Sequence, residues 1–244
     1  MGLCRLCLKE KKLLKKSHII PDFLFKDFKE NNYFINMKYP EVNKVKRFYT
    51  GYYDKDILCQ QCDNEIIGKL ETYTSKAFYH KNKHENQISK AKTFDGLELQ
   101  IYANIDYKKF KLFLLSILWR ASISTHEMFI DIQLGIHEEK LRKMIYEDNP
   151  LSEKEFEICI LEVNSNVELN LNFITNPLNI INKENKLFCF YIKGRFYFIS
   201  VEINSSIDYY KAISIKESNK IEIPIIEMNY AKKIFEKIWG ISYI

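Results

Sequence analysis

The stretches CRLC at residues 4–7 and CQQC at residues 59–62 determine how the first third of this chain folds. Each holds two cysteines three positions apart, a spacing that places both sulfur atoms on one side of a tight turn. Two such pairs supply the four corners of a tetrahedral site. The sequence therefore predicts that Cys4, Cys7, Cys59 and Cys62 bind one structural Zn²⁺ ion.

The remaining cysteines, Cys159 and Cys189, lie in apolar, strand-like stretches and are predicted to be core residues. The N-terminus MGLCRLC lacks the apolar segment of a secretory signal. The longest apolar run, FLLSILW at 113–119, is far shorter than the roughly 20 residues that cross a bilayer. We therefore expect a cytoplasmic protein without membrane contact, whose thiols stay reduced.

The positive charge is concentrated at one end of the chain. Residues 1–100 hold 19 Lys and Arg against 13 Asp and Glu, a net charge of +6, whereas the remainder has a net charge of −1. An excess of this kind favours contact with a polyanion, although a solvated lysine-rich surface has the same composition. Hydrophobic residues make up 46% of the chain, which excludes a disordered protein.

The predicted elements of residues 1–80 follow the two cysteine pairs. Residues 12–20 read as a short hairpin that ends at Pro21, residues 22–31 as a brief helix and residues 31–57 as an irregular hairpin or loop. After Cys62 the apolar residues recur at helical spacing. A knuckle, a hairpin and a helix that opens with the second ligand pair form a treble-clef zinc module of ββα order.

The fold class that follows is α+β, with the treble-clef module at 1–80, a connecting segment at 81–105 and a domain at 106–244. This last domain is predicted to combine two helices over 106–147, an antiparallel sheet after 156 and a closing helix that ends at Gly240. Within the sheet, β-branched and aromatic residues on both sides of Lys193 and Gly194 predict a hairpin. Nothing in it specifies a reaction. A protein partner or a second copy of the chain could bind there.

The motifs CRLC, SHIIP at 17–21 and LCQQCDN at 58–64 together resemble the zinc-stabilised branch of the HNH, or ββα-metal, endonucleases. The resemblance covers about a third of the chain. It implies metal-assisted hydrolysis of a phosphodiester in DNA or RNA, with His18 as general base. Asp63 and Asn64 would hold a catalytic Mg²⁺ or Mn²⁺ ion, apart from the structural zinc. A role in phage–host conflict would suit such a protein.

One position departs from the family pattern. The residue before the catalytic histidine is usually acidic or histidine, and here it is Ser17, a weak ligand for hard cations. Asp63 could replace the missing carboxylate, or the site could be degenerate. In the second case His18 would only hold a strand, and Asp63 and Asn64 would only cap a helix.

Basic residues next to aromatic ones are typical of nucleic-acid grooves, which bind phosphates and stack on bases. On this ground we expect nucleic acid to contact Lys12, Lys15, Lys16, Lys46 and Arg47. Two other functions stay open. One is a non-catalytic, zinc-dependent nucleic-acid-binding module, and the other is a protein-interaction subunit in which zinc only stabilises the fold.

Overall fold

A computed structural model describes most of the chain. Within that described part, no helix is long and apolar enough to cross a membrane. The described residues are 1–25, 34–36, 46–48, 51–79, 88–164, 174–180, 186–201 and 213–240.

A seven-stranded sheet dominates the fold, which confirms the α+β class. Its strand order is β10-β11-β12-β9-β13-β8-β7. β13 runs parallel to β9, and all other neighbours are antiparallel, so the predicted antiparallel sheet is instead mixed. The strands are β7 (Ile88–Lys92), β8 (Glu98–Ala103), β9 (Ile158–Val163), β10 (Leu178–Asn179), β11 (Leu187–Ile192), β12 (Arg195–Ser200) and β13 (Lys220–Ile226).

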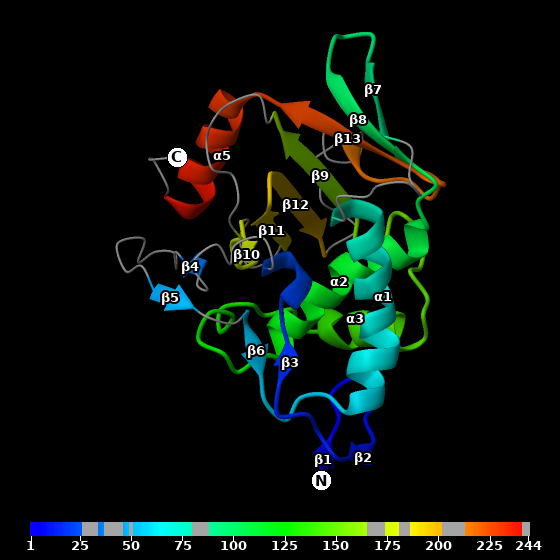
Figure 1. Cartoon of the computed structure of the whole chain (residues 1–244), viewed down its shortest axis with the longest axis vertical. Coiled ribbons are helices and arrows are strands. Elements are labelled where there is room, and N and C mark those ends of the chain that lie inside the picture. Colours follow the sequence, from blue (N-terminus) through cyan, green and yellow to red (C-terminus); the bar gives the residue numbers. More distant parts are fainter. Residues whose placement is uncertain are drawn as a thin grey trace.

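Helices cover both faces of this sheet, because side chains alternate along each strand. In β12, Tyr197 and Ile199 pack toward α2 (Tyr107–Ile123), whereas Phe196 and Phe198 pack toward α5 (Met228–Trp239). Figure 1 shows α2 and α3 (His137–Tyr146) on one side of the strands and α5 on the other. The sheet is therefore the middle layer of three.

The central helix α2 is buried on almost all sides, as expected for a helix that is apolar all round. It begins where the Asp106 carboxylate accepts a hydrogen bond from the Lys109 backbone N–H at 3.0 Å. Its buried polar side chains have partners: Lys111 Nζ donates to the Ser152 carbonyl at 2.7 Å, and Ser116 Oγ to the Phe113 carbonyl at 2.7 Å.

Two predicted boundaries of the C-terminal half are confirmed by backbone geometry. Lys193 and Gly194 both have positive φ, 46° and 86°, which is the geometry of a tight turn between β11 and β12. Gly240 ends α5 with a φ of 65° and donates its N–H to the Glu236 carbonyl at 3.0 Å.

The N-terminal part contains short strands that pair over long sequence distances. β1 (Gly2–Leu3) pairs with β2 (Glu10–Lys11), and β3 (Ser17–His18) pairs with β6 (Tyr53–Asp54). The predicted hairpin within residues 12–20 is therefore wrong, because the partner of β3 lies on the far side of a long insertion. Local patterning could not reveal this pairing.

The insertion itself is only partly described. Residues 22–25 form a single 3₁₀ turn, and the rest of the predicted helix over 22–31 lies outside the described residues. β4 (Phe34–Asn36) and β5 (Lys46–Phe48) pair antiparallel, in agreement with the irregular hairpin predicted over 31–57.

The second cysteine pair opens a helix, as predicted. Its middle part is α1 (Gly68–Thr74), and the flanking segments Gln61–Ile67 and Ser75–Tyr79 are wound as π-helix. In the first of these, the Gly68 N–H bonds to the Asp63 carbonyl, five residues back. π-Turns of this kind are frequent at functional sites.

The N-terminal part and the sheet share one hydrophobic core, which extends from Cys4 through α2 to Ile223. Residues 88–92 and 98–103, which the sequence assigned to a connecting segment, are strands of the sheet, and Figure 1 shows them as a hairpin at the end of the molecule opposite β1 and β2. The domain boundaries at 80 and 105 stay a prediction.

Candidate metal centre and adjoining cleft

Four thiols gather in the part of the molecule that carries β1 and β2, which Figure 1 shows at its lower end. The Sγ atoms of Cys4, Cys7, Cys59 and Cys62 all lie within 4.8 Å of one another. In a tetrahedral zinc site with Zn–S bonds of about 2.3 Å, neighbouring sulfurs lie about 3.8 Å apart. The four cysteines are thus positioned to bind a metal ion after a small contraction. Among the described residues this is the one group of metal-binding side chains so close together.

Proton sharing within the cluster also favours a cation. Hydrogen bonding from Cys62 lowers the pKa of Cys4, and the same contact, together with burial, raises the pKa of Cys62. Four crowded sulfurs cannot all ionise without a positive charge among them. Metal binding would therefore release protons from this site.

The backbone folds around the first cysteine pair in a tight knuckle. The Leu8 N–H donates to the Cys4 carbonyl at 2.9 Å, and the Cys59 N–H donates to the Cys4 sulfur at 3.3 Å. Leu8 has a φ of 55°, an unusual value for a residue with a branched side chain. The knuckle thus places the sulfurs at the cost of strain at Leu8.

Helix α3 holds the knuckle from outside. Arg142 Nη1 donates to the Leu6 carbonyl at 2.5 Å, and Arg5 lies 3.5 Å from Glu138. The predicted zinc module therefore packs directly on a helix that the sequence assigned to the C-terminal domain.

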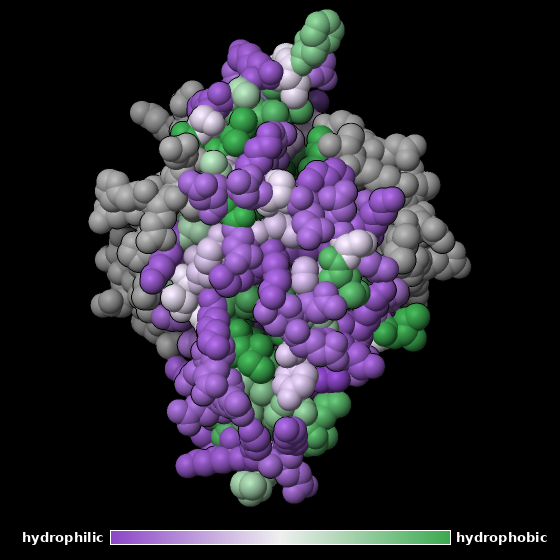
Figure 2. Space-filling model, turned by 90° about the vertical axis from the view of Figure 1, so that its right-hand side faces the viewer, coloured by the Kyte–Doolittle hydropathy of each residue, from purple (hydrophilic) through white to green (hydrophobic). Residues whose placement is uncertain are grey.

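An open cleft of about 570 Å³ lies between β3 and the helix that follows the second cysteine pair. It brings together all three predicted catalytic residues, His18, Asp63 and Asn64, although the histidine is distant from the other two in sequence. The side of the molecule that carries α1 is largely hydrophilic, with scattered apolar side chains (Figure 2). The other residues that line the cleft are Asp22, Phe23, Gly68, Glu71, Thr72, Ser75 and Lys76.

A buried arginine fixes the backbone of His18. Arg120, from α2, is 1% exposed, and its Nη1 atom lies 2.7 Å from the His18 carbonyl oxygen and 2.7 Å from Glu71 Oε1. Its Nε atom donates to the Ser116 carbonyl at 3.2 Å, so the guanidinium cannot turn away. β3 and α1 are therefore joined through a residue of the central helix.

The environment of His18 favours the neutral imidazole. Burial lowers the pKa of His18, the Arg120 charge acts in the same direction, and the carboxylates of Asp22 and Glu71 oppose both. Asp22 Oδ1 lies 3.9 Å from His18 Nε2, close enough to stabilise an imidazolium once a proton has been taken up. Such an imidazole can accept a proton near neutral pH.

Asp63 lines the cleft, whereas Ser17 does not. Burial raises the pKa of Asp63, Arg120 opposes the rise and Glu71 adds to it. Ser17 is fully buried, and its hydroxyl makes no hydrogen bond of good geometry among the described residues, although it is near enough to Asp63 to lower that pKa. Ser17 thus points inward, away from the position of a solvent-accessible metal ligand.

The helix does not use Asp63 or Asn64 as a cap. Its N-cap residue is Gln60, which makes no capping hydrogen bond through its side chain, and Asp63 lies in the first turn. As an acidic residue of the first turn, Asp63 still stabilises the helix dipole, so the purely structural alternative for this pair stays open.

Of the predicted nucleic-acid contacts, the three lysines within residues 12–16 have described side chains. Lys12 is exposed, Lys15 pairs with Asp56 at 3.3 Å, and Lys16 Nζ lies 4.4 Å from the Tyr53 ring centre. Lys46 and Arg47 are in β5, and their side chains lie outside the described residues.

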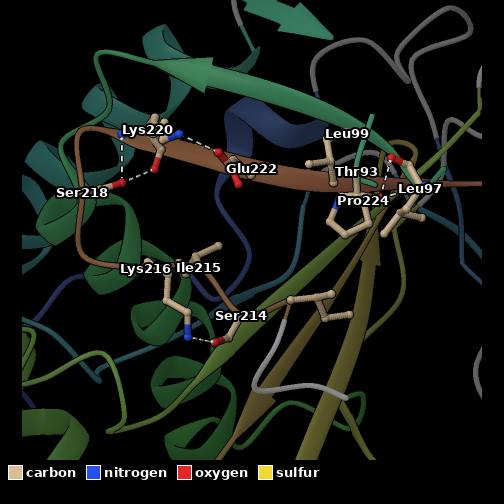
Figure 3. Close-up of a pocket in the computed structure, with 11 residues that line it drawn as sticks. Thr93, Leu97, Leu99, Ser214, Ile215, Lys216, Ser218, Lys220, Glu222 and Pro224 are labelled. Carbon is tan, nitrogen blue, oxygen red and sulfur yellow. Dashed lines mark hydrogen bonds and ion pairs between the residues drawn. The ribbon is translucent and has the colours of Figure 1, made fainter. Parts of the chain in front are cut away.

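A second hollow, of about 370 Å³, lies beside β8 and β13. Figure 3 shows that its charged groups are engaged locally: Lys220 Nζ pairs with Glu222 at 2.7 Å, and Lys216 Nζ donates to Ser214 Oγ at 2.9 Å. No set of polar groups converges there among the labelled residues, so the cleft beside His18 is the better candidate site.

Sequence reasoning missed three charged residues of the site. No sequence motif points to a role for Asp22, Glu71 or Arg120 in the cleft. A charged residue at 120 within the apolar run of α2 was the one available signal, because a buried arginine needs partners.

Comparison with protein-family models, with curated proteins and with solved structures gives no match.

Proposed function

We propose that this protein is a metal-dependent nuclease of the HNH type, which hydrolyses phosphodiester bonds of DNA or RNA in the cleft beside His18. The observation that carries the proposal is that His18, from β3, and Asp63 and Asn64, from the helix after the second cysteine pair, line one open cleft. Four clustered thiols lie at the start of the same helix.

We attribute the thiol cluster to structural Zn²⁺ in a treble-clef module. All four ligands are cysteines, as in closed structural zinc sites, which leave no position for a reacting water. Their order along the chain, with strands 17–18 and 53–54 between the two pairs and a helix after them, agrees with a ββα unit.

His18 is the proposed general base. Its lowered pKa keeps the imidazole neutral near pH 7, and its partly exposed ring faces the cleft. It would take the proton of the attacking water, and Asp22 would stabilise the resulting imidazolium. Arg120 holds the histidine backbone while this charge forms.

Asp63 and Asn64 are the residues that would hold a divalent cation, since Mg²⁺ and Mn²⁺ prefer oxygen ligands. Such an ion supplies charge neutralisation at the scissile phosphate. With Ser17 buried, Asp63 is the proposed replacement for the acidic residue that the family pattern has before the histidine.

The test is cleavage of plasmid, single-stranded DNA and RNA with Mg²⁺ or Mn²⁺. We expect His18→Ala and Asp63→Ala to abolish cutting, whereas the matched controls His137→Ala and Asp131→Ala, which lie outside the cleft, retain it. All variants must keep the zinc content of the wild type. Cutting that survives in His18→Ala would disprove the proposed base.

A non-catalytic nucleic-acid-binding module is the second candidate. One observation favours it. Among the described residues only the thiols are grouped closely enough to hold a metal, so the cleft carboxylates do not form a ready-made metal site. Salt-sensitive binding without cleavage on any substrate would select this function.

A further inference from the structure

The β3–β6 ladder has an inner and an outer face, set by strand alternation. Ser17 pairs with Asp54 in register, and both are buried; His18 pairs with Tyr53. Successive side chains point to opposite faces, so His18 and Tyr53 lie on the outer face. Their rings are 6.5 Å apart and packed edge to face.

Two lysines continue this outer face. Extended by one step, the same register places Lys16 opposite Lys55; both are exposed, and Lys16 Nζ lies 4.4 Å from the Tyr53 ring centre. Like charges across a ladder are unfavourable and favour an anion between them. Lys15, the residue before Lys16, instead pairs with Asp56 at 3.3 Å.

A separate hollow of about 510 Å³ adjoins Tyr53 and shares no lining residue with the cleft beside His18. Lys55, Thr125 and His126 also line it. His126 Nδ1 accepts the Met128 N–H at 3.2 Å, so in its neutral form the proton is on Nε2, which is then a donor. The one carboxylate among the lining residues, Asp54, is 9% exposed.

The carboxylate oxygens of Asp54 already accept hydrogen bonds within the protein. Its oxygens accept hydrogen bonds from the Thr125 N–H at 2.6 Å and from Ser124 Oγ at 3.0 Å. The hollow therefore presents an aromatic ring and a lysine, with its one carboxylate already hydrogen-bonded, a combination that suits a base attached to a phosphate.

We propose that the outer face formed by Lys16, Tyr53 and Lys55, with the hollow beside it, is a subsite for an unpaired nucleotide next to the scissile phosphate. The base would stack on Tyr53, and Lys16 and Lys55 would bind the neighbouring phosphate. The row formed by His18 and Tyr53 and the row formed by Lys16 and Lys55 lie about 6.6 Å apart along the strands. This distance is comparable with the spacing of successive phosphates in an extended single strand. This inference rests on the proposed function and adds that the substrate is single-stranded at the site.

The experiment measures binding without a catalytic metal, by fluorescence anisotropy. Wild type is compared with Tyr53→Leu on an oligothymidylate of about eight nucleotides and on the same backbone without bases. We expect wild type to prefer the intact oligonucleotide by about tenfold and Tyr53→Leu to lose that preference. Tyr53→Phe should keep it, and so should the matched control Tyr230→Leu, at an exposed tyrosine of α5.

The lysines are tested by salt dependence. Lys16→Ala with Lys55→Ala should reduce the slope of log K against log salt by roughly 1.4, whereas Lys232→Ala with Lys233→Ala on α5 should leave it unchanged. Zinc content is checked for every variant.

The outcomes separate the two proposals. A base preference that persists in Tyr53→Leu overturns the subsite, even when the wild type cleaves. Tyr53-dependent binding without any cleavage supports the subsite and overturns the nuclease. If the wild type binds neither oligonucleotide, the subsite is overturned, and the nuclease proposal is decided by the cleavage assay alone.

Discussion

Arg120 Nη1 lies 2.7 Å from the carbonyl oxygen of His18, a hydrogen bond between residues 102 positions apart in sequence. The same atom lies 2.7 Å from Glu71 Oε1. A single guanidinium in the central helix therefore sets the positions of the histidine strand and of the helix on the other side of the cleft. The candidate site is assembled across the predicted domain boundary.

Arg120→Met should destabilise the protein by about 3 kcal/mol, because it leaves the His18 carbonyl and the Glu71 carboxylate without their shared donor. Urea unfolding measures the loss. The control Arg5→Met removes an exposed ion pair with Glu138 and should cost about 0.5 kcal/mol or less. Equal effects of the two substitutions would show that Arg120 does not hold the site together.

Chelation of the metal should unfold the N-terminal part first, since four sulfurs without a cation cannot all be thiolates. Limited proteolysis would then cut within residues 1–79 while the sheet stays protected. Cys59→Ser should lose the metal, and the control Cys159→Ala, at a core cysteine, should keep it. Unchanged protease resistance after chelation would contradict a structural metal.

Asp54 fastens β6 to the residues that follow α2. Asp54→Ala should cost about 2–3 kcal/mol, because it removes charged hydrogen bonds from Ser124 and from the Thr125 N–H. Thermal unfolding with calorimetry at pH 7 measures the loss. A loss below about 0.5 kcal/mol would show that this contact does not join the two segments.

The same carboxylate predicts a pH dependence. Burial works to raise the pKa of Asp54, but the hydrogen bonds from Thr125, Lys55 and Ser124 outweigh it and lower the pKa. Its stabilising contribution is therefore complete above the unfolded value of about 3.9 and is lost as the pH falls through the lower folded value. In Asp54→Asn this part of the acid destabilisation should be absent.

Leu8→Gly should stabilise the knuckle by about 1 kcal/mol, since glycine adopts the φ of 55° without strain. The leucine is half exposed, so little apolar burial is lost. The control Leu3→Gly, at a similarly exposed leucine in β1, should lower the melting temperature instead. If both variants are less stable than wild type, Leu8 contributes packing that outweighs the strain.

The cleavage rate should rise with pH with a midpoint below the ordinary histidine value of about 6.5, because burial lowers the pKa of His18 and the neutral imidazole is the base. Arg120→Gln, which removes one of the charges that lower this pKa, should shift the midpoint upward. A midpoint that is the same in both proteins, and above 6.5, would argue against His18 as the group that titrates.

The cysteine spacing, the apolar period of α2, the Lys-Gly turn and the terminal Gly240 are local signals, and each led from sequence alone to the element observed. The thiol cluster followed from the C-x-x-C pairs because two turns of fixed geometry need only be brought together. That His18, Asp63 and Asn64 share a cleft rested on a family resemblance, since no local rule links residue 18 with residue 63.

Tertiary structure alone decided the rest. The pairing of β3 with β6, the parallel contact of β9 with β13 and the placement of Arg120 under His18 join segments far apart in the chain. Such contacts depend on which buried surfaces fit together. The spacing of apolar residues within a helix or strand does not identify the element that packs against it. Because side chains alternate along a strand, Ser17 points inward and Tyr53 points outward. The proposed catalytic groups besides His18 therefore lie on other elements, and the expected neighbour of His18 is not among them.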